Sequence, residues 1–470
     1  MKTIFKGVLL LGLLAGGAAA ALWAVNVRGE VDVTVPVARV AATSALLDKG
    51  AYLARAGNCM TCHTARGGTP YAGGRAIDTP FGAVYTSNLT PDDATGLGTW
   101  NAAHFYRALH NGRSKDGRLL NPVFPYTNYT LVTRADSDAL FAFLKSLPPA
   151  NSPAKPSGLR FPYNLQASLA VWRALYFTPG KPGPDAATPT TTDATDAADQ
   201  TAQTAQTAQT AQTSNAGGSA EWQRGAYLVN GMGHCSACHT PRNALGGEDA
   251  SKNLAGGLIP VQNWYAPSLV SPHEASTAAW TTAETVRLLK TGVAREASIG
   301  GPMAEVVQGG TQYLTDQDLG AMAVYLKSLP QDTRIPKTDA ARPPAAVATQ
   351  GALLYEQHCA QCHGADGKGQ RLAEAAGLVG GTMAYPALAG NRAVTMPQTA
   401  NLVQIVLNGG YPPSTAGNPR PFGMPPFVLL LNDDDIAAVL THIRSSWGNQ
   451  GALVSPLDVN RIRARQAGGS

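Results

Sequence analysis

One five-residue motif, Cys-x-x-Cys-His, occurs three times in the chain and uses all six of its cysteines. It is the attachment signature of c-type haem: each thiol adds to a vinyl group, and the adjacent histidine binds the iron from the proximal side. We therefore predict three covalently bound haem c groups. The predicted attachment residues are Cys59, Cys62, Cys235, Cys238, Cys359 and Cys362, and the predicted proximal iron ligands are His63, His239 and His363.

Two other uses of a Cys-x-x-Cys pair agree less well with the sequence. A zinc site needs two more soft ligands at matching spacing, and no cysteine is left to supply them. A thioredoxin-like dithiol needs a βαβ context and does not require a following histidine. Structural disulfides are excluded by the same count, because every cysteine belongs to a motif.

Length and charge limit the classes of function. At 470 residues the chain has room for about three domains of ~150 residues each. The formal net charge is +5, from 36 basic and 31 acidic residues, and no basic run is interleaved with aromatic residues. We therefore expect no nucleic-acid partner.

Residues 1–27 carry an export signal. Lys2 and Lys6 precede an uncharged run over 7–27, and 18–21 offers A-x-A cleavage sites, as in a secretory signal peptide. The run is also long enough to cross a bilayer as a retained anchor, with Trp23 near its outer end. Both interpretations stay open. Because haem is attached to thiols outside the cytoplasm, we expect the protein on the periplasmic side of the bacterial inner membrane, either anchored or peripheral.

The motifs lie in internal repeats. The stretch 50–53 before the first motif returns at 225–228 and more loosely at 351–354, at the place of an N-terminal helix. Each unit ends in an amphipathic pattern that begins with an N-cap residue. These caps are Thr133, Thr315 and Asn432. We predict a mostly α protein of three tandem class I cytochrome c-like domains joined by linkers. The predicted divisions are 1–27 for the signal peptide or anchor, 42–183 for domain 1, 184–219 for a disordered Thr/Ala/Gln linker, 220–330 for domain 2, 331–346 for a second linker, 347–450 for domain 3 and 451–470 for a polar tail.

The sixth iron ligand should come from the loop before each closing helix, where electron-transfer cytochromes usually place a methionine. Met303 follows His239, and Met424 follows His363, at nearly equal offsets along the chain. Each has a neighbouring proline that would stiffen the loop. We predict these two methionines as distal ligands.

The first unit departs from this pattern. Phe124 follows His63 at the same offset at which Met424 follows His363, so it stands in the place of the methionine. No methionine occurs between Met60 and Met232. Three alternatives remain. The iron is five-coordinate and covered by Phe124, or His104 or His110 supplies a nitrogen ligand, or a residue from elsewhere in the chain or from a partner reaches the iron.

Two further stretches, 87–100 and 301–315, carry a resemblance to a known family. Together with the motifs, they make the chain, over about residues 42–447, similar to the tri-haem cytochrome c subunits of bacterial membrane-associated dehydrogenases. These include quinoprotein (PQQ) alcohol, flavoprotein gluconate, and molybdenum aldehyde, isoquinoline and nicotinate dehydrogenases. The resemblance implies the same histidine and methionine ligands. Many members have methionine where this chain has Phe124, and the phenylalanine version is commoner among companions of molybdenum enzymes.

The resemblance implies an electron-transfer subunit and not an enzyme. A partner dehydrogenase of the molybdenum, PQQ or flavin type would oxidise an alcohol, an aldehyde or an N-heterocycle. Its electrons would then pass through the haems to membrane quinone or another respiratory acceptor. The rival expectation is a haem enzyme that uses an open distal site at haem 1 for peroxidase-like or small-ligand chemistry. That reaction would need a distal acid–base group, for which His104 and His110 are the candidates.

Overall fold

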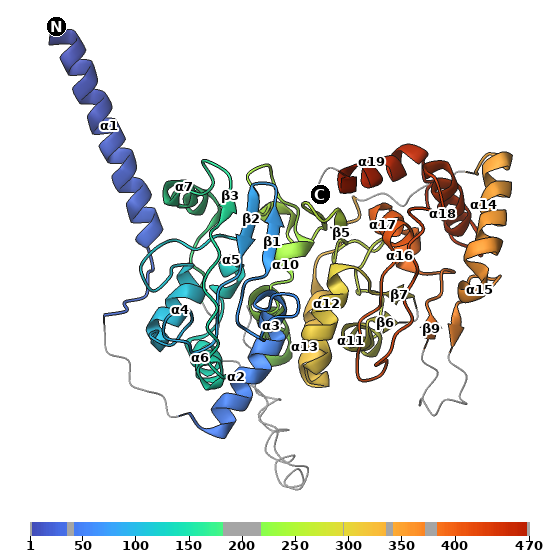
Figure 1. Cartoon of the computed structure of the whole chain (residues 1–470), viewed down its shortest axis with the longest axis horizontal. Helices are drawn as coiled ribbons and strands as arrows, with labels where there is room; N and C mark the ends of the chain where they lie inside the picture. Colours follow the sequence, from blue (N-terminus) through green and yellow to red (C-terminus); the bar gives the residue numbers. More distant parts are fainter. Residues whose placement is uncertain are drawn as a thin grey trace.

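The computed structural model describes residues 2–34, 42–181, 218–294, 296–334, 342–371 and 383–467. Most of the predicted linker over 184–219, and part of the linker over 331–346, lie outside the described residues. Helix α1 (Lys2–Val27) projects away from the body, and three helical units follow one another along the long axis, with the second unit in the middle (Figure 1). The prediction of a mostly α fold is confirmed.

Each unit combines helices with short antiparallel strands. Unit 1 contains α2 (Ser44–Ala56), α3 (Cys59–Cys62), β1 (Ala76–Thr79), β2 (Gly82–Tyr85), α4 (Ala102–Asn111), α5 (Tyr126–Tyr129), α6 (Arg134–Ser146), β3 (Gly158–Leu159) and α7 (Gln166–Tyr176). Unit 2 contains α9 (Ala220–Tyr227), the π-helical turn η2 (Leu228–Met232), α10 (Ser236–His239), η3 (Ala250–Lys252), β4 (Gly257–Ile259), β5 (Trp264–Ala266), α11 (Thr282–Thr291), β6 (Val293–Ala294), β7 (Ala297–Ser298), α12 (Pro302–Gly309), η4 (Thr311–Tyr313) and α13 (Asp316–Ser328). Unit 3 contains α14 (Ala345–His358), α15 (Ala360–His363), β8 (Gln370–Arg371), β9 (Met383–Tyr385), α16 (Arg392–Thr395), α17 (Ala400–Asn408), α18 (Asp433–Ser445) and α19 (Pro456–Ala467).

The first helix of each unit packs across its closing helix, as α2 on α6, α9 on α13 and α14 on α18. The repeated glycine found in the sequence lies at each crossing. A Cβ atom on Gly50, Gly225 or Gly351 would overlap a carbonyl oxygen of the closing helix. Glycine is therefore required here because the two backbones touch. The predicted N-caps are confirmed, since the side chains of Thr133, Thr315 and Asn432 each accept a backbone N–H from the residue three positions later.

Units 1 and 2 share one hydrophobic core, whereas unit 3 has its own. A single buried cluster contains Leu53 and Leu140 of unit 1 together with Leu228 and Leu319 of unit 2. The cluster of unit 3 is separate from it and centres on α17 and α18. The first two units therefore form one module, to which the third is joined by polar contacts.

Two buried carboxylates connect units 1 and 2 reciprocally. Tyr52 of α2 donates a hydrogen bond to Asp318 of α13, and Tyr227 of α9 donates one to Asp136 of α6, both at 2.5 Å. Asp318 and Asp136 are 0% and 4% exposed. Each carboxylate also pairs at 2.8 Å with a cation of its own unit, which is Arg224 for Asp318 and Lys49 for Asp136.

Unit 3 carries different residues on the equivalent face. Gln350 and Leu353 take the positions of the cation and the tyrosine. Its acid, Asp435, completes a capping box with Asn432 and accepts a bond of 2.7 Å from Gln350. Because the tyrosine is missing, this face cannot form the reciprocal contact made by units 1 and 2.

The prediction of a polar tail over 451–470 is wrong for Pro456–Ala467, because these residues form helix α19. This helix packs on α17 and α18 and buries Val459 and Ile462. Arg463 pairs with Asp433 at the start of α18, with 2.7 Å between nitrogen and oxygen. Apolar residues one turn apart place this helix in the core of unit 3, although most of the segment is polar.

Candidate haem-attachment sites

Each Cys-x-x-Cys-His motif forms a short helical turn directly after the first helix of its unit, as α3, α10 and α15. None of the six cysteines, all of which lie within the described residues, forms a disulfide. The first cysteine of each motif, Cys59, Cys235 or Cys359, packs against a hydrophobic core. Burial raises the pKa of Cys59 and Cys235 to about 12 and that of Cys359 to about 11. A reactive dithiol needs the opposite shift, so these sites do not resemble redox dithiols.

The three motif histidines share one geometry. Each ring places Nδ1 against a backbone carbonyl oxygen, which selects the tautomer that carries the proton on Nδ1 and leaves the Nε2 lone pair free for a metal. Burial lowers the pKa of each imidazole, and so favours the neutral ring that ligates iron. The Nδ1-to-oxygen pairs are His63 with Ser87 at 2.7 Å, His239 with Pro267 at 2.6 Å and His363 with Pro386 at 3.0 Å. Thiols against an apolar core, next to an oriented neutral imidazole, fit covalent haem c.

The distal loop of unit 1 lies on the attachment motif of unit 2. Asn128 of α5 donates to the Ser236 hydroxyl inside the second motif and to the Asn230 carbonyl, both at 2.8 Å. The Tyr129 hydroxyl donates back to the Gly57 carbonyl, just before the first motif, at 3.2 Å. Helix α5 thus holds both attachment motifs close together.

The distal helix of unit 2 makes the reciprocal contact. Helix α12 packs on α3, and a Cβ atom on Gly309 would overlap the side chains of Asn58 and Thr61. Arg75 of unit 1 donates to the Thr61 carbonyl and pairs with Glu305 of α12, both at 2.8 Å. The attachment sites of units 1 and 2 therefore face one shared interface. These contacts join loop residues far apart in the chain, and no spacing pattern in the sequence signals them.

The two methionines predicted as distal ligands precede the closing helices of their units, Met303 within helix α12 and Met424 in the loop before α18. Met303 is half-buried in the first turn of α12, directly after Pro302. Met424 packs against the core of unit 3, and its backbone exchanges hydrogen bonds of 2.8 and 3.0 Å with Gly410. These backbone bonds hold the loop that carries Met424 in place.

Phe124 is part of an aromatic cluster at the interface of units 1 and 2. Its ring lies 5.3 Å from the ring of Tyr129, which itself meets His234 edge-on at 5.5 Å. Phe124 also packs against the shared core. The residue in the place of the methionine thus adds apolar contact to the shared core.

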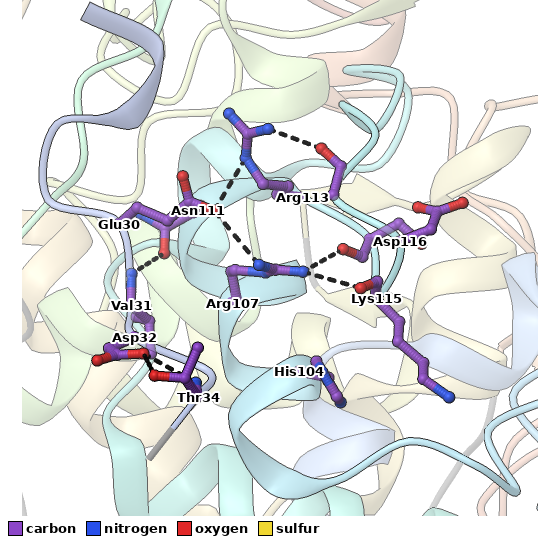
Figure 2. A network of polar contacts seen from close by, with 12 residues as sticks. Glu30, Val31, Asp32, Thr34, His104, Arg107, Asn111, Arg113, Lys115 and Asp116 are labelled. Carbon is purple, nitrogen blue, oxygen red and sulfur yellow. Dashed lines mark hydrogen bonds and ion pairs between the residues drawn. The ribbon is translucent and has the colours of Figure 1, made fainter. Parts of the chain in front are cut away.

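The two candidate histidines lie on either side of the core-facing stripe of α4, which Phe105 and Leu109 form. His104 closes the helix capping box with Asn101, and its ring points toward the polar side of α4 near Arg107 (Figure 2). Burial, and then the nearby cations, lower the pKa of His104. His110 is buried and stacks on Tyr106 at 5.2 Å, and its Nδ1 is without a hydrogen-bond partner among the described residues.

The fold and these sites define a multi-haem c-type cytochrome. The family model for cytochrome c matches residues 47–148, 222–330 and 348–447, one segment in each unit, and the chain belongs to the cytochrome c family. It is 35% identical over 441 residues to the alcohol dehydrogenase (quinone) cytochrome c subunit of Gluconacetobacter polyoxogenes, covering 90% of this chain and 85% of that one. It is 34% identical over 440 residues to the gluconate 2-dehydrogenase cytochrome c subunit of Pantoea cypripedii, covering 90% of each chain. It is 36% identical over 445 residues to a nicotinate dehydrogenase subunit of Pseudomonas putida, covering 92% of this chain and 33% of that one.

These comparisons confirm the predicted resemblance and the three haem c groups, with one cysteine pair in each matched segment. The first two relatives are named as cytochrome c subunits. The chain is accordingly an electron-transfer protein, and the rival expectation of a haem enzyme finds no support among them.

Proposed function

We propose that the protein accepts electrons from the catalytic subunit of a dehydrogenase and passes them through three haems to membrane quinone or another respiratory acceptor. The observation that carries this proposal is the packing of the first two attachment motifs at one interface, with unit 2 joined to unit 3 on its other side. The names of the relatives support a dehydrogenase partner, and one of them includes the word quinone.

In this proposal His63, His239 and His363 are the proximal ligands, each oriented by the carbonyl that accepts its Nδ1–H. Met303 and Met424 are the distal ligands of units 2 and 3. Bound haem c supplies one-electron chemistry, and the chain sets its potential through ligand identity, burial and hydrogen bonds. Phe124 covers the distal side in unit 1. His104 is occupied as a cap, and His110 remains the candidate nitrogen ligand.

Unit 2 would be the obligatory middle step of the relay. It contacts unit 1 through the shared core, and it contacts unit 3 through Asn401, which exchanges bonds of 2.8 and 2.7 Å with the backbone of Tyr265. Gln312 of unit 2 also donates to the Ser414 carbonyl of unit 3, at 3.1 Å. Electrons between the two outer haems would therefore pass through the haem held by His239.

Membrane association is proposed through unit 1. The stretch Ile4–Val27 is long and apolar enough to cross a bilayer, and its most apolar part is 0% buried. Its end is held on unit 1 by Asn26, which donates to the Ala170 carbonyl of α7 at 3.0 Å. Glu30 follows and pairs with Arg113 at 3.0 Å and Arg107 at 3.4 Å (Figure 2).

The segment beside this junction has an apolar surface. The α7 patch consists of Phe161, Tyr163, Leu165, Val171 and Leu175, which are 38–77% exposed. Over 161–176 the one charged residue is Arg173, and it is buried. A membrane entered by α1 would lie against this patch, so we assign the acceptor end of the relay to unit 1.

The proposal is tested on the haem-loaded chain isolated from its own host membranes. We expect a dehydrogenase subunit to copurify with it and to reduce all three haems when substrate is added, and we expect a quinone analogue to reoxidise them. A chain that copurifies with no dehydrogenase, or haems that such a partner leaves oxidised, would overturn the proposal.

A further inference from the structure

One peptide group in unit 2 connects the proximal histidine to a buried acid. The Pro267 carbonyl accepts the Nδ1–H of His239 at 2.6 Å. The N–H of the same peptide group, which belongs to Ser268, donates to Oε2 of Glu274, also at 2.6 Å. A single conjugated amide therefore lies between the imidazole and the carboxyl group. A negative charge on Glu274 polarises this amide and so strengthens the hydrogen bond from His239 to the Pro267 carbonyl.

Glu274 is buried, and its two carboxylate oxygens accept hydrogen bonds from neutral donors. The residue is 3% exposed, and the Tyr265 hydroxyl donates to its two oxygens at 3.2 and 3.0 Å. Burial raises the pKa of Glu274, while the Ser268 N–H and the Tyr265 hydroxyl oppose that rise by bonding to the ionised form. Both hydrogen-bond donors to Glu274 are neutral. Neither of them cancels the carboxylate charge, which therefore acts on the Pro267–Ser268 peptide.

The other two units lack this acid. In each unit a backbone carbonyl accepts the Nδ1–H of the proximal histidine. The residue seven positions after that carbonyl is the one equivalent to Glu274. That residue is Ala94 in unit 1, Glu274 in unit 2 and Ala393 in unit 3. Units 1 and 2 are in register here, because Trp100 and Trp280 follow the accepting carbonyls of their units at the same offset.

We propose that Glu274 is a positioning residue for His239: its negative charge strengthens the His239 hydrogen bond to Pro267, makes the imidazole a more basic ligand and lowers the reduction potential of haem 2. This inference rests on the proposed ligand assignment. Partners behind a metal-bound histidine fix its orientation and raise its basicity, and a more basic ligand stabilises the oxidised iron. Haems 2 and 3 share His/Met ligation in the proposal, so Glu274 would separate their potentials.

The test compares the full haem-loaded chain with its Glu274→Gln variant by spectroelectrochemical titration. Glutamine keeps the shape and can still accept the Ser268 N–H, but it removes the charge. We expect one of the three reduction potentials to rise by ~59 mV, which is a tenfold change in the equilibrium constant of a one-electron couple. The other two potentials should stay unchanged. The matched control is Asp316→Asn, which removes the same charge from the surface of unit 2, where the side chain of Asp316 is 79% exposed. We expect no shift from it.

A second variant keeps the test decisive if Glu274→Gln loads haem poorly. Tyr265→Phe removes a donor from Glu274. In a titration at alkaline pH, where the carboxylate keeps its charge without this donor, the same potential should fall or stay in place. The proposal would be overturned if Glu274→Gln left all three reduction potentials unchanged. It would also be overturned if the potential rose in Tyr265→Phe, or if Asp316→Asn raised it as much as Glu274→Gln does. The charge-transfer absorption of methionine-bound ferric haem is recorded in parallel. Its absence from the wild-type chain would reject the ligand assignment, while the potentials still report separately on Glu274.

Discussion

Replacing Asp318 by asparagine should destabilise units 1 and 2 together and leave unit 3 unchanged. The side chains of Asp318 and Arg224 are 1% and 8% exposed, and the two groups form a pair of hydrogen bonds, both 2.8 Å long. Removing one partner of a buried ion pair leaves the other charge uncompensated, which costs about 3–5 kcal/mol. Asparagine can still accept the hydrogen bond from the Tyr52 hydroxyl, so we expect the free energy of unfolding to fall by about 3 kcal/mol, the lower end of this range.

Urea unfolding of the haem-loaded chain measures this loss. Because units 1 and 2 share a core and unit 3 has its own, we expect two transitions. With a slope of about 3 kcal/mol per molar urea, a loss of ~3 kcal/mol lowers the midpoint of the first transition by about 1 M.

Unit 3 provides the control. Asp435 occupies the position equivalent to Asp318, but its partners are the Asn432 N–H and the Gln350 amide, both neutral. Asp435→Asn should cost about 1 kcal/mol and affect only the second transition. A loss below ~1 kcal/mol for Asp318→Asn, or one that shifts both transitions equally, would refute the inference that a buried ion pair stabilises a two-unit module.

Three further outcomes are expected. Phe124→Met should give haem 1 the His/Met ligation proposed for the other two haems. A redox titration should then show one potential rising, and the ferric spectrum should show one additional low-spin His/Met haem. An unchanged spectrum would place Phe124 away from the iron. Burial, and then the bond to Asp318, raise the pKa of Tyr52 to about 12 from 10.0. The folded chain therefore holds this proton where the unfolded chain loses it, and stability falls as pH rises from about 10 to about 12. Thermal unfolding should show a shallower fall for Tyr52→Phe, and an identical slope would contradict this. Leu175→Glu should reduce labelling of 161–176 by a photoactivatable phospholipid about tenfold, since burying a leucine contributes ~1.5 kcal/mol. Leu429→Glu, at a leucine that is 99% exposed outside the α7 patch, is the control, and equal effects would argue against the patch.

The sequence by itself determined the local features of this protein. The haem-attachment chemistry follows from five adjacent residues, and the N-caps follow from residues three positions apart. The crossing glycines were visible as a repeat because each unit needs the same close approach of two helices. Such features depend on neighbours along the chain, and a repeated pattern marks them.

Only the tertiary structure decided how the units associate. Tyr52 and Asp318 are 266 residues apart in the chain, and neither looks different from a packing aromatic or a helix-cap acid in the sequence. Gln350 and Leu353 leave the third unit outside the shared core, although its fold is the same. The peptide that joins His239 to Glu274 likewise becomes visible only when the loop folds back on the motif. Burial and hydrogen-bond partners are properties of the folded arrangement, which residue spacing along the chain does not encode.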